Sequence, residues 1–206
     1  MKYPQTCILQ FAKAPRAGHV KTRLEPALGE QGALELHKKL VRHTWQTLHR
    51  ADVATVQLWV DSVAESDFFS TLTPMVETLH QQQGADLGQR MMQAIGQTLA
   101  QFEQVILVGS DCPALDEGYL SQAVNALESA DVVLGPASDG GYVLIGMRQL
   151  RAEVFRHINW GSDQVLMQTR ARLEQSGCQW HELPERWDVD RPEDLSKLDG
   201  VILIEG

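Results

Sequence analysis

Short apolar segments alternate with amphipathic ones along most of this 206-residue chain. Strands are predicted at 6–12, 54–60, 105–109, 132–135 and 142–147, more weakly near 75–80 and 178–183, and at 201–204. Helices are predicted at 30–50, near 65–72, from Asp86 onward, near 116–129, at 163–175 with Ser162 as its cap, and from Pro192. Strands that alternate with helices are joined by crossovers, so we expect an α/β fold whose mostly parallel sheet has helices on both faces.

Composition narrows the class of protein further. A formal net charge of -9 argues against a general nucleic-acid binder, and 43% hydrophobic residues indicate a globular chain. No apolar run approaches the roughly 18 residues of a membrane span, and the first residues do not resemble a signal peptide. Three widely spaced cysteines, Cys7, Cys112 and Cys178, exclude a disulfide framework and suit a reducing cytoplasm. Without a linker or repeat, residues 1–206 are predicted to form a single cytoplasmic domain.

Ligands of such sheets bind outside the carboxyl ends of the strands, so we expect the binding residues in the loops that follow strands. The first of these loops, 13–24, is basic in an acidic chain and contains Lys13, Arg16, Gly18, Lys21 and Arg23. Arginine forks, lysine charges and backbone N–H groups freed by glycine are what a phosphate needs. Neither G-x-x-x-x-G-K-[ST] nor G-x-G-x-x-G is present. A solvated loop without a ligand is the equal alternative.

Acidic residues occupy two later loops. Asp111 directly follows the strand 105–109, where a carboxylate could hold Mg²⁺ together with water and substrate phosphate oxygens. Asp188 and Asp190 lie two residues apart and share a face of an extended segment, so either could join Asp111 on a metal ion. The alternatives are a cap or an Asx turn for Asp111 and the start of the last helix for the other two.

The remaining candidates carry weaker signals. Asp139-Gly140-Gly141 is a turn signal, and Asp139 could equally recognise or activate a substrate hydroxyl. Asp86 opens a helix on which Arg90, one turn in, could face a bound anion or form a surface ion pair. The seven histidines lack zinc spacing, no G-x-S-x-G exists, and Trp160 is expected to pack in the core.

Six segments taken in order carry a resemblance to a known family. They are K-A-P-R-A-G-H-V-K-T-R-L (13–24), G-A-D-L-G-Q-R-M (84–91), G-S-D-C-P-A-L (109–115), L-G-P-A-S-D-G-G-Y-V-L-I-G (134–146), W-G-S-D-Q-V-L (160–166) and D-V-D-R-P-E-D-L (188–195). Together they resemble the bacterial rSAM/selenodomain-associated transferases, which are grouped with the nucleotide-diphospho-sugar transferase (GT-A) fold. The resemblance implies a Rossmann-like three-layer α/β/α sandwich that binds a sugar nucleotide or nucleoside triphosphate with a divalent metal.

The resemblance also implies roles for single residues. Phosphates would be held by Lys13, Lys21 and Arg23. Asp111 would match the last aspartate of a D-x-D metal motif, of which G-S-D retains only that residue, so Asp188 or Asp190 would supply a second ligand. V-K-T-R-L is also similar to 2-phospholactate guanylyltransferases, and D-V-D-R-P-E-D-L to the metal side of nucleotidylyltransferases, although their Gly-rich L-x-G-G loop is missing.

Three functions follow as hypotheses. The first is a glycosyltransferase that uses a nucleotide-sugar donor and a small acceptor, with Mg²⁺ or Mn²⁺ on Asp111 and Asp139 as acceptor ligand or general base. The second is a nucleotidylyltransferase that joins a nucleoside triphosphate to a phosphorylated small molecule. The third is a sugar-nucleotide-binding module without catalysis. All three exclude nucleic acid and a membrane span as partners.

Overall fold

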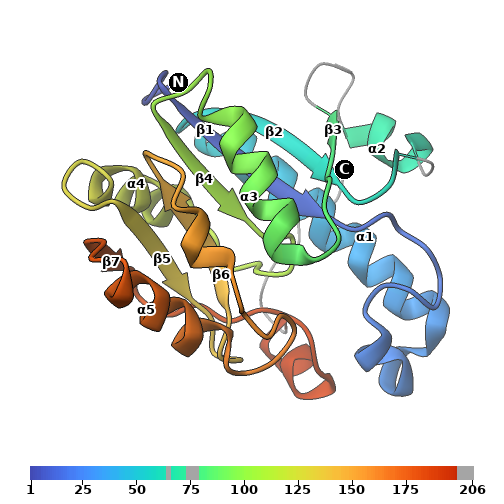
Figure 1. The fold of residues 1–206 in the computed structure, drawn as a ribbon. Coiled ribbons are helices and arrows are strands. Elements are labelled where there is room, and N and C mark those ends of the chain that lie inside the picture. Colours follow the sequence, from blue (N-terminus) through green and yellow to red (C-terminus); the bar gives the residue numbers. More distant parts are fainter. Residues whose placement is uncertain (64–65, 73–78, 199–206) are drawn as a thin grey trace.

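A computed structural model of the chain describes residues 1–63, 66–72 and 79–198. Its centre is a seven-stranded sheet in the order β3-β2-β1-β4-β6-β5-β7 (Figure 1). The strands are β1 (Thr6–Ala12), β2 (Thr55–Val60), β3 (Leu79–Gln81), β4 (Gln104–Val108), β5 (Val132–Pro136), β6 (Tyr142–Met147) and β7 (Trp180–Glu182). All neighbours pair in parallel except β6, which is antiparallel to β4 and β5. The predicted α/β fold with a mostly parallel sheet is confirmed.

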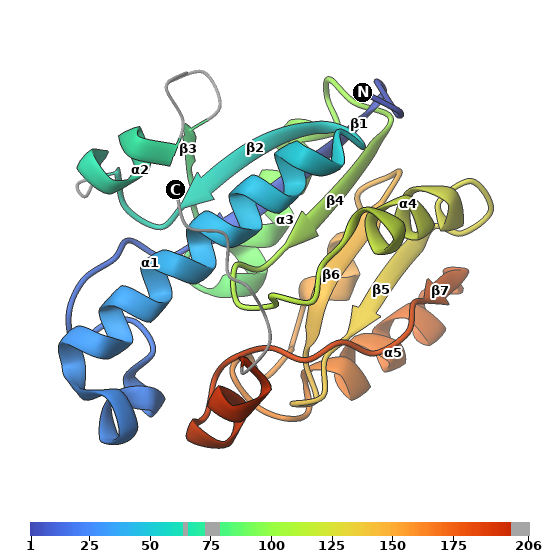
Figure 2. The same cartoon turned by 180° about the vertical axis from the view of Figure 1, so that it is seen from behind.

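Helices cover both faces of the sheet. They are α1 (Glu25–Ala51), α2 (Ser66–Leu72), α3 (Leu87–Thr98), α4 (Glu117–Ala126) and α5 (Val165–Gln175), with short 3-10 turns η1 (Thr22–Leu24), η4 (Ala152–Phe155) and η5 (Pro192–Leu198). Figure 1 shows α3 and α5 in front of the sheet, and the reverse view in Figure 2 shows α1 and α4 in front of it. The chain is therefore the three-layer sandwich that the resemblance implies.

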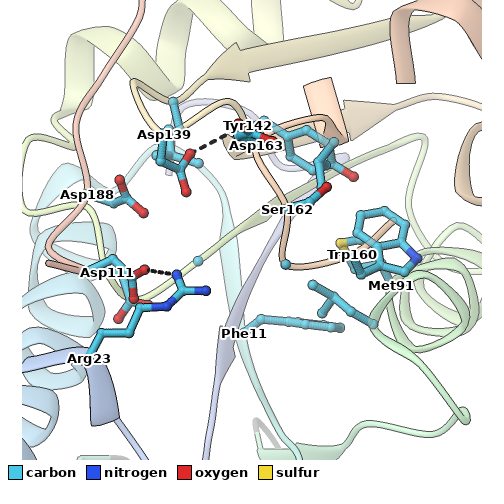
Figure 3. A pocket seen from close by; sticks show the side chains of 18 of the residues that line it. Phe11, Arg23, Met91, Asp111, Asp139, Tyr142, Trp160, Ser162, Asp163 and Asp188 are labelled. Carbon is cyan, nitrogen blue, oxygen red and sulfur yellow. Dashed lines mark hydrogen bonds and ion pairs between the residues drawn. The ribbon is translucent and has the colours of Figure 1, made fainter. Parts of the chain in front are cut away.

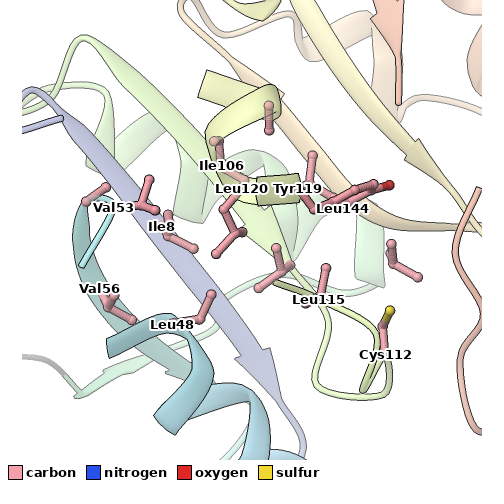
Figure 4. Close-up of a cluster of buried hydrophobic side chains, with 14 of the residues drawn as sticks. Ile8, Leu48, Val53, Val56, Ile106, Cys112, Leu115, Tyr119, Leu120 and Leu144 are labelled. Atoms are coloured by element: carbon pink, nitrogen blue, oxygen red, sulfur yellow. The ribbon is translucent and has the colours of Figure 1, made fainter. Parts of the chain in front are cut away.

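Successive side chains of each strand point to opposite faces of the sheet, so one hydrophobic core forms on each face. Ile8 of β1 and Ile106 of β4 point to the face covered by α1 and α4, and a part of this core is drawn in Figure 4. Their neighbours Leu9 and Leu107 point to the opposite face and pack under α3 and α5. Successive strand residues face opposite sides, so strands buried on both faces read as continuous apolar runs.

Several element boundaries differ from the predicted ones. Helix α1 is interrupted at Gly29, whose backbone is non-helical, so its continuous part begins at residue 30 as predicted. The turn before it, from Glu25, was not predicted; Pro26 is acceptable there because it stands in a first turn. Helix α5 has Gln164 as its N-cap residue, while Ser162 Oγ accepts a hydrogen bond from the Gln164 backbone N–H at 3.3 Å. The strand expected near 75–80 falls partly on residues 73–78, and that at 201–204 wholly on the last eight, outside the described residues.

The order of strands places a crevice at one edge of the sheet. From β1 the chain proceeds to β2 on one side, while β4 pairs with the other side of β1. At such a switch point the loops that leave the carboxyl ends of the two strands diverge and leave room for a ligand. In the part of the chain that the structure describes, no helix is long and apolar enough to cross a membrane.

Candidate functional site

A hollow of about 350 Å³ opens at the carboxyl ends of β1 and β4 (Figure 3). One part of its lining is charged and comes from the loops after the strands: Arg23, Asp111, Asp139, Asp188, Asp190 and Arg191. Another part is aromatic and apolar: Phe11, Leu87, Met91, Tyr142, Trp160 and Val165. We call these the charged half and the aromatic half of the hollow. A pocket of this size with both kinds of lining is typical of a small-molecule site.

The Lys21 side chain links three loops beneath the charged half through its contacts with Asp111 and Val189. Its Nζ lies 2.8 Å from Asp111 Oδ1 and donates a hydrogen bond of 2.5 Å to the Val189 carbonyl oxygen. The Val189 N–H in turn donates to the Asp111 carbonyl oxygen at 2.9 Å. The Lys21 side chain is only 3% exposed, so its ammonium group already has protein partners where the sequence suggested phosphate. The structure thus joins the basic loop, the loop after β4 and segment 187–191.

The pKa values of the carboxylates around this lysine are shifted in opposite directions. Loss of solvation acts to raise the pKa of Asp111, but the Lys21 ammonium group outweighs it and holds that pKa below its usual value. Burial first, and then the negative charges of Asp139 and Asp111, raise the pKa of Asp188 to about 6. Asp188 therefore sits in a surplus of negative charge that an added cation would relieve.

Asp190 lies at the edge of the same group but faces a different partner. Its carboxylate forms an ion pair with Arg23, whose side chain is largely exposed, and its backbone N–H donates to Asp194 Oδ2 at 3.2 Å. Within the described ranges no group of three His, Cys, Asp or Glu side chains is arranged to hold a metal ion. The set Asp111, Asp188 and Asp190 is therefore not assembled around a common point.

The turn after β5 combines the two interpretations that the sequence left open. Asp139 Oδ1 accepts the Gly141 N–H at 2.8 Å, as in an Asx turn, and both residues also line the hollow. Gly140 has a φ of +88°, and a Cβ there would overlap the carbonyl oxygen of Asp163. The Gly140 carbonyl accepts the Leu166 N–H at 2.9 Å. These contacts fix Asp139 against the start of α5.

Other candidates from the basic loop lie away from the hollow. Lys13 and Arg16 line a separate, smaller hollow of about 180 Å³ together with Asp61. Arg16 Nη2 donates to Ser62 Oγ at 2.8 Å. Gly18 has a φ of +72° and allows the loop to turn back toward α1. Of the basic side chains in this loop, only Arg23 lines the main hollow in the described structure.

Asp86 and Arg90 shape the start of α3 and do not line the hollow. Asp86 is the N-cap, as predicted, and its Oδ1 accepts the Gln89 N–H at 2.8 Å. Arg90 Nε donates to the Gly84 carbonyl oxygen at 3.2 Å. Both contacts are local, so their expected contact with a bound anion remains a prediction.

The aromatic half was missed from the sequence. Trp160 packs on the core beneath α3 and also lines the hollow, where it meets Tyr142 edge to face with ring centroids 6.5 Å apart. A Cβ on Gly88 would lie 2.6 Å from Trp160 Nε1, so the indole rests directly on the α3 backbone. Asp163 follows three residues later in W-G-S-D and lines the same hollow. That motif was the only available signal, since a tryptophan beside a loop usually packs in a core.

Solved structures share this architecture. A "putative nucleotide-diphospho-sugar transferase" of Desulfovibrio desulfuricans G20 has a TM-score of 0.85 and 29% identity, with 96% of both chains covered. A CMP:2-keto-3-deoxy-manno-octonic acid synthetase complexed with CTP has a TM-score of 0.63 at 8% identity, covering 95% of this chain and 97% of that one. Rv0371c of Mycobacterium tuberculosis H37Rv, complexed with manganese, has a TM-score of 0.60 at 13% identity, covering 96% and 100%. The last two similarities establish the fold alone.

Sequence comparisons agree with this placement. A 2-phospho-L-lactate guanylyltransferase of Methanothermobacter thermautotrophicus is 28% identical over 126 residues, or 61% of this chain and 55% of that protein, so the chain spans about half the length of this curated relative. The similarities to the Desulfovibrio and Methanothermobacter proteins place the chain in the superfamily of nucleotidyltransferases and nucleotide-sugar transferases. None of these proteins carries the rSAM/selenodomain name. A family model described as "Uncharacterized protein conserved in bacteria (DUF2064)" matches residues 44–162, more than half of the chain, which therefore belongs to the DUF2064 family.

Proposed function

We propose that this protein is a nucleotidyltransferase that joins a nucleoside triphosphate to a phosphorylated small molecule. In this reaction an oxygen of the acceptor phosphate forms a bond to the α-phosphorus of the nucleotide. The bond from that phosphorus to the oxygen bridging to the β-phosphate breaks, and its electron pair leaves with pyrophosphate. The observation that carries the proposal is a single hollow at the β1–β4 switch point, lined by Arg23 and by Asp111, Asp139 and Asp188.

Charge determines where the nucleotide would lie. Arg23 stands at the charged half and is exposed enough to exchange its partner Asp190 for a phosphate. Lys13 and Arg16 lie farther back on the same loop and would meet the outer phosphates as they extend from the hollow. Lys21 acts differently in this proposal, because its buried ammonium group orients Asp111. CTP in a protein of the same fold supports a nucleoside triphosphate as donor.

A divalent cation fits the donor set of the charged half. Asp111 and Asp188 offer the hard oxygen ligands that Mg²⁺ and Mn²⁺ prefer. Burial is the main cause of the raised pKa of Asp188, and the nearby charges of Asp139 and Asp111 add to it. With two protein carboxylates, the remaining ligands would be waters and phosphate oxygens; Asp190 would join only by leaving Arg23. The cation would supply charge stabilisation to the departing pyrophosphate. Manganese in a protein of this fold supports such a use.

Asp139 has a role that depends on the acceptor. A phosphate monoester is already ionised at neutral pH and needs no general base, so Asp139 would orient the acceptor or the cation. Glycosyl transfer to a hydroxyl would instead need a general base, for which Asp139 is the candidate that lines the hollow. This second function is favoured by the similarity to a nucleotide-diphospho-sugar transferase, whereas the guanylyltransferase relative favours nucleotidyl transfer.

The products distinguish these functions. Phosphorus NMR would follow the protein with Mg²⁺ and GTP or CTP plus 2-phospholactate, glucose 1-phosphate or phosphocholine, and separately with UDP-glucose or GDP-mannose plus glycerol or glucose. We expect pyrophosphate and a new diphosphate diester, with Asp139→Asn lowering turnover and leaving nucleotide affinity within about threefold. Release of nucleoside diphosphate from a nucleotide sugar would establish glycosyl transfer instead. Binding of a nucleotide sugar without turnover in any mixture would point to a binding module.

A further inference from the structure

The aromatic half of the hollow differs chemically from the charged half. It presents the rings of Phe11 and Trp160 together with the edge of Tyr142, and none of its lining residues is a lysine or arginine. Figure 3 shows Phe11, Met91 and Trp160 on the side of the hollow opposite Arg23. A second phosphate would find no cationic partner there, so this half must take a different part of a substrate.

The position of Trp160 is fixed before any ligand arrives. Its indole lies against the α3 backbone at Gly88, where no Cβ would fit, and the Tyr142 ring meets it at an interplanar angle of 88°. A rigid aromatic wall loses little conformational entropy when a ligand binds to it. A preformed surface of this kind suits specific recognition of one chemical group better than nonspecific hydrophobic binding.

A carboxylate lines the same hollow as these rings. Asp163 lines the hollow, its side chain is exposed, and it forms no hydrogen bond or ion pair through its carboxylate with another described residue. An apolar ligand would pack on the rings but would gain nothing from this negative charge. An ammonium group satisfies both, because cations are attracted to aromatic faces and to a carboxylate.

From these observations we propose that the acceptor is a phosphorylated amino alcohol, a molecule with a phosphate at one end and an ammonium group at the other. The ammonium group would bind between Trp160, Phe11 and Asp163, while the phosphate would reach the charged half beside Arg23. This inference rests on the proposed nucleotidyl transfer for its chemistry, but the ammonium site is tested by binding alone.

Calorimetric titration of two ligands of nearly the same shape isolates the contribution of the positive charge. Phosphocholine carries a trimethylammonium group where 3,3-dimethylbutyl phosphate carries a neutral tert-butyl group. We expect phosphocholine to bind the full chain, with Mg²⁺ and without nucleotide, about tenfold more tightly. Trp160→Leu and Asp163→Asn should each reduce this preference to within about threefold. Met167→Ala, at a side chain that is 59% exposed and does not line the hollow, should leave it unchanged.

Each other outcome has a definite meaning. Equal affinity of the two ligands, or no binding of either, would overturn the ammonium site. A preference that survives in Asp163→Asn, whose change lies on an exposed side chain and should not impair folding, would overturn it as well. A loss of GTP or CTP affinity in Trp160→Leu without any phosphocholine binding would assign the wall to the nucleobase. Tight phosphocholine binding without pyrophosphate release would keep the ammonium site and refute nucleotidyl transfer.

Discussion

Replacing Lys21 by methionine tests the contact that joins the three loops of the site. Methionine keeps most of the buried apolar stem but removes an ammonium group with two partners, Asp111 Oδ1 at 2.8 Å and the Val189 carbonyl at 2.5 Å. Breaking a fully buried ion pair costs about 3–5 kcal/mol. Asp111 is 45% exposed and can be solvated when left alone, so we expect a smaller loss, about 2–3 kcal/mol. For a chain of this length that loss corresponds to a fall in Tm of roughly 5–10 °C.

The stability lost in Lys21→Met should be larger at neutral pH than at acidic pH. Lys21 holds the pKa of Asp111 below its unfolded value of 3.8, so the pair contributes its full stability above that pH and loses it as the pH falls below. Urea denaturation at pH 7 measures the full contribution, and a second titration near pH 3 should show a smaller one. Lys38→Met is the matched control, because it breaks a partly exposed pair with Glu35 at 2.9 Å and should cost less than about 0.5 kcal/mol. If the two variants lose equal stability at pH 7, the account of Lys21 as the link between the loops is wrong.

Three further changes test other parts of the site. Asp188→Asn should raise the free energy of unfolding at pH 7 by roughly 1–3 kcal/mol, because folding disfavours the ionised carboxylate and raises its pKa to about 6. In urea denaturation this gain should vanish near pH 4, and an equal gain at both pH values would contradict the prediction. Gly140→Ala should lower the free energy of unfolding by more than about 2 kcal/mol, since a Cβ there would overlap the Asp163 carbonyl. Gly177→Ala has a similar φ of +66° but open space around the Cβ, so it should cost about 1 kcal/mol. Equal losses in thermal melts would refute the steric overlap. Asp86→Asn should change the free energy of unfolding by less than about 0.5 kcal/mol, because asparagine also caps a helix. A loss of GTP affinity in calorimetry would then show that the carboxylate binds the ligand, and unchanged affinity would show that it serves the helix alone.

Much of the fold was predictable because its strands are buried on both faces. The run V-I-L-V-G at 105–109 lies within one residue of β4, since a strand buried on both faces permits few polar residues. The turn at the start of α1, before Gly29, was not predictable from periodicity. It is exposed, so no apolar stripe marks it.

The site was predictable only as far as topology determines it. Loops after neighbouring parallel strands must meet at one edge, and this rule brings Arg23 and Asp111 to the same hollow. The direction of each side chain depends on tertiary contacts that no local pattern contains. Arg16 therefore lies at a second hollow, and the buried partners of Lys21 were not foreseen. For Trp160 the sequence favours core packing over a place at a cleft, because it cannot show that one edge of a packed ring borders a cavity.

In the proposed function, basic and acidic loops hold one polyanion together with a divalent cation. This arrangement is tested by the affinity of GTP for the wild-type chain and for Asp111→Asn, measured by calorimetry with and without Mn²⁺. We expect Mn²⁺ to strengthen binding to the wild type at least tenfold and to have little effect on the variant, while thermal melts without ligand show both folded. Equal strengthening by Mn²⁺ in the two proteins would contradict it.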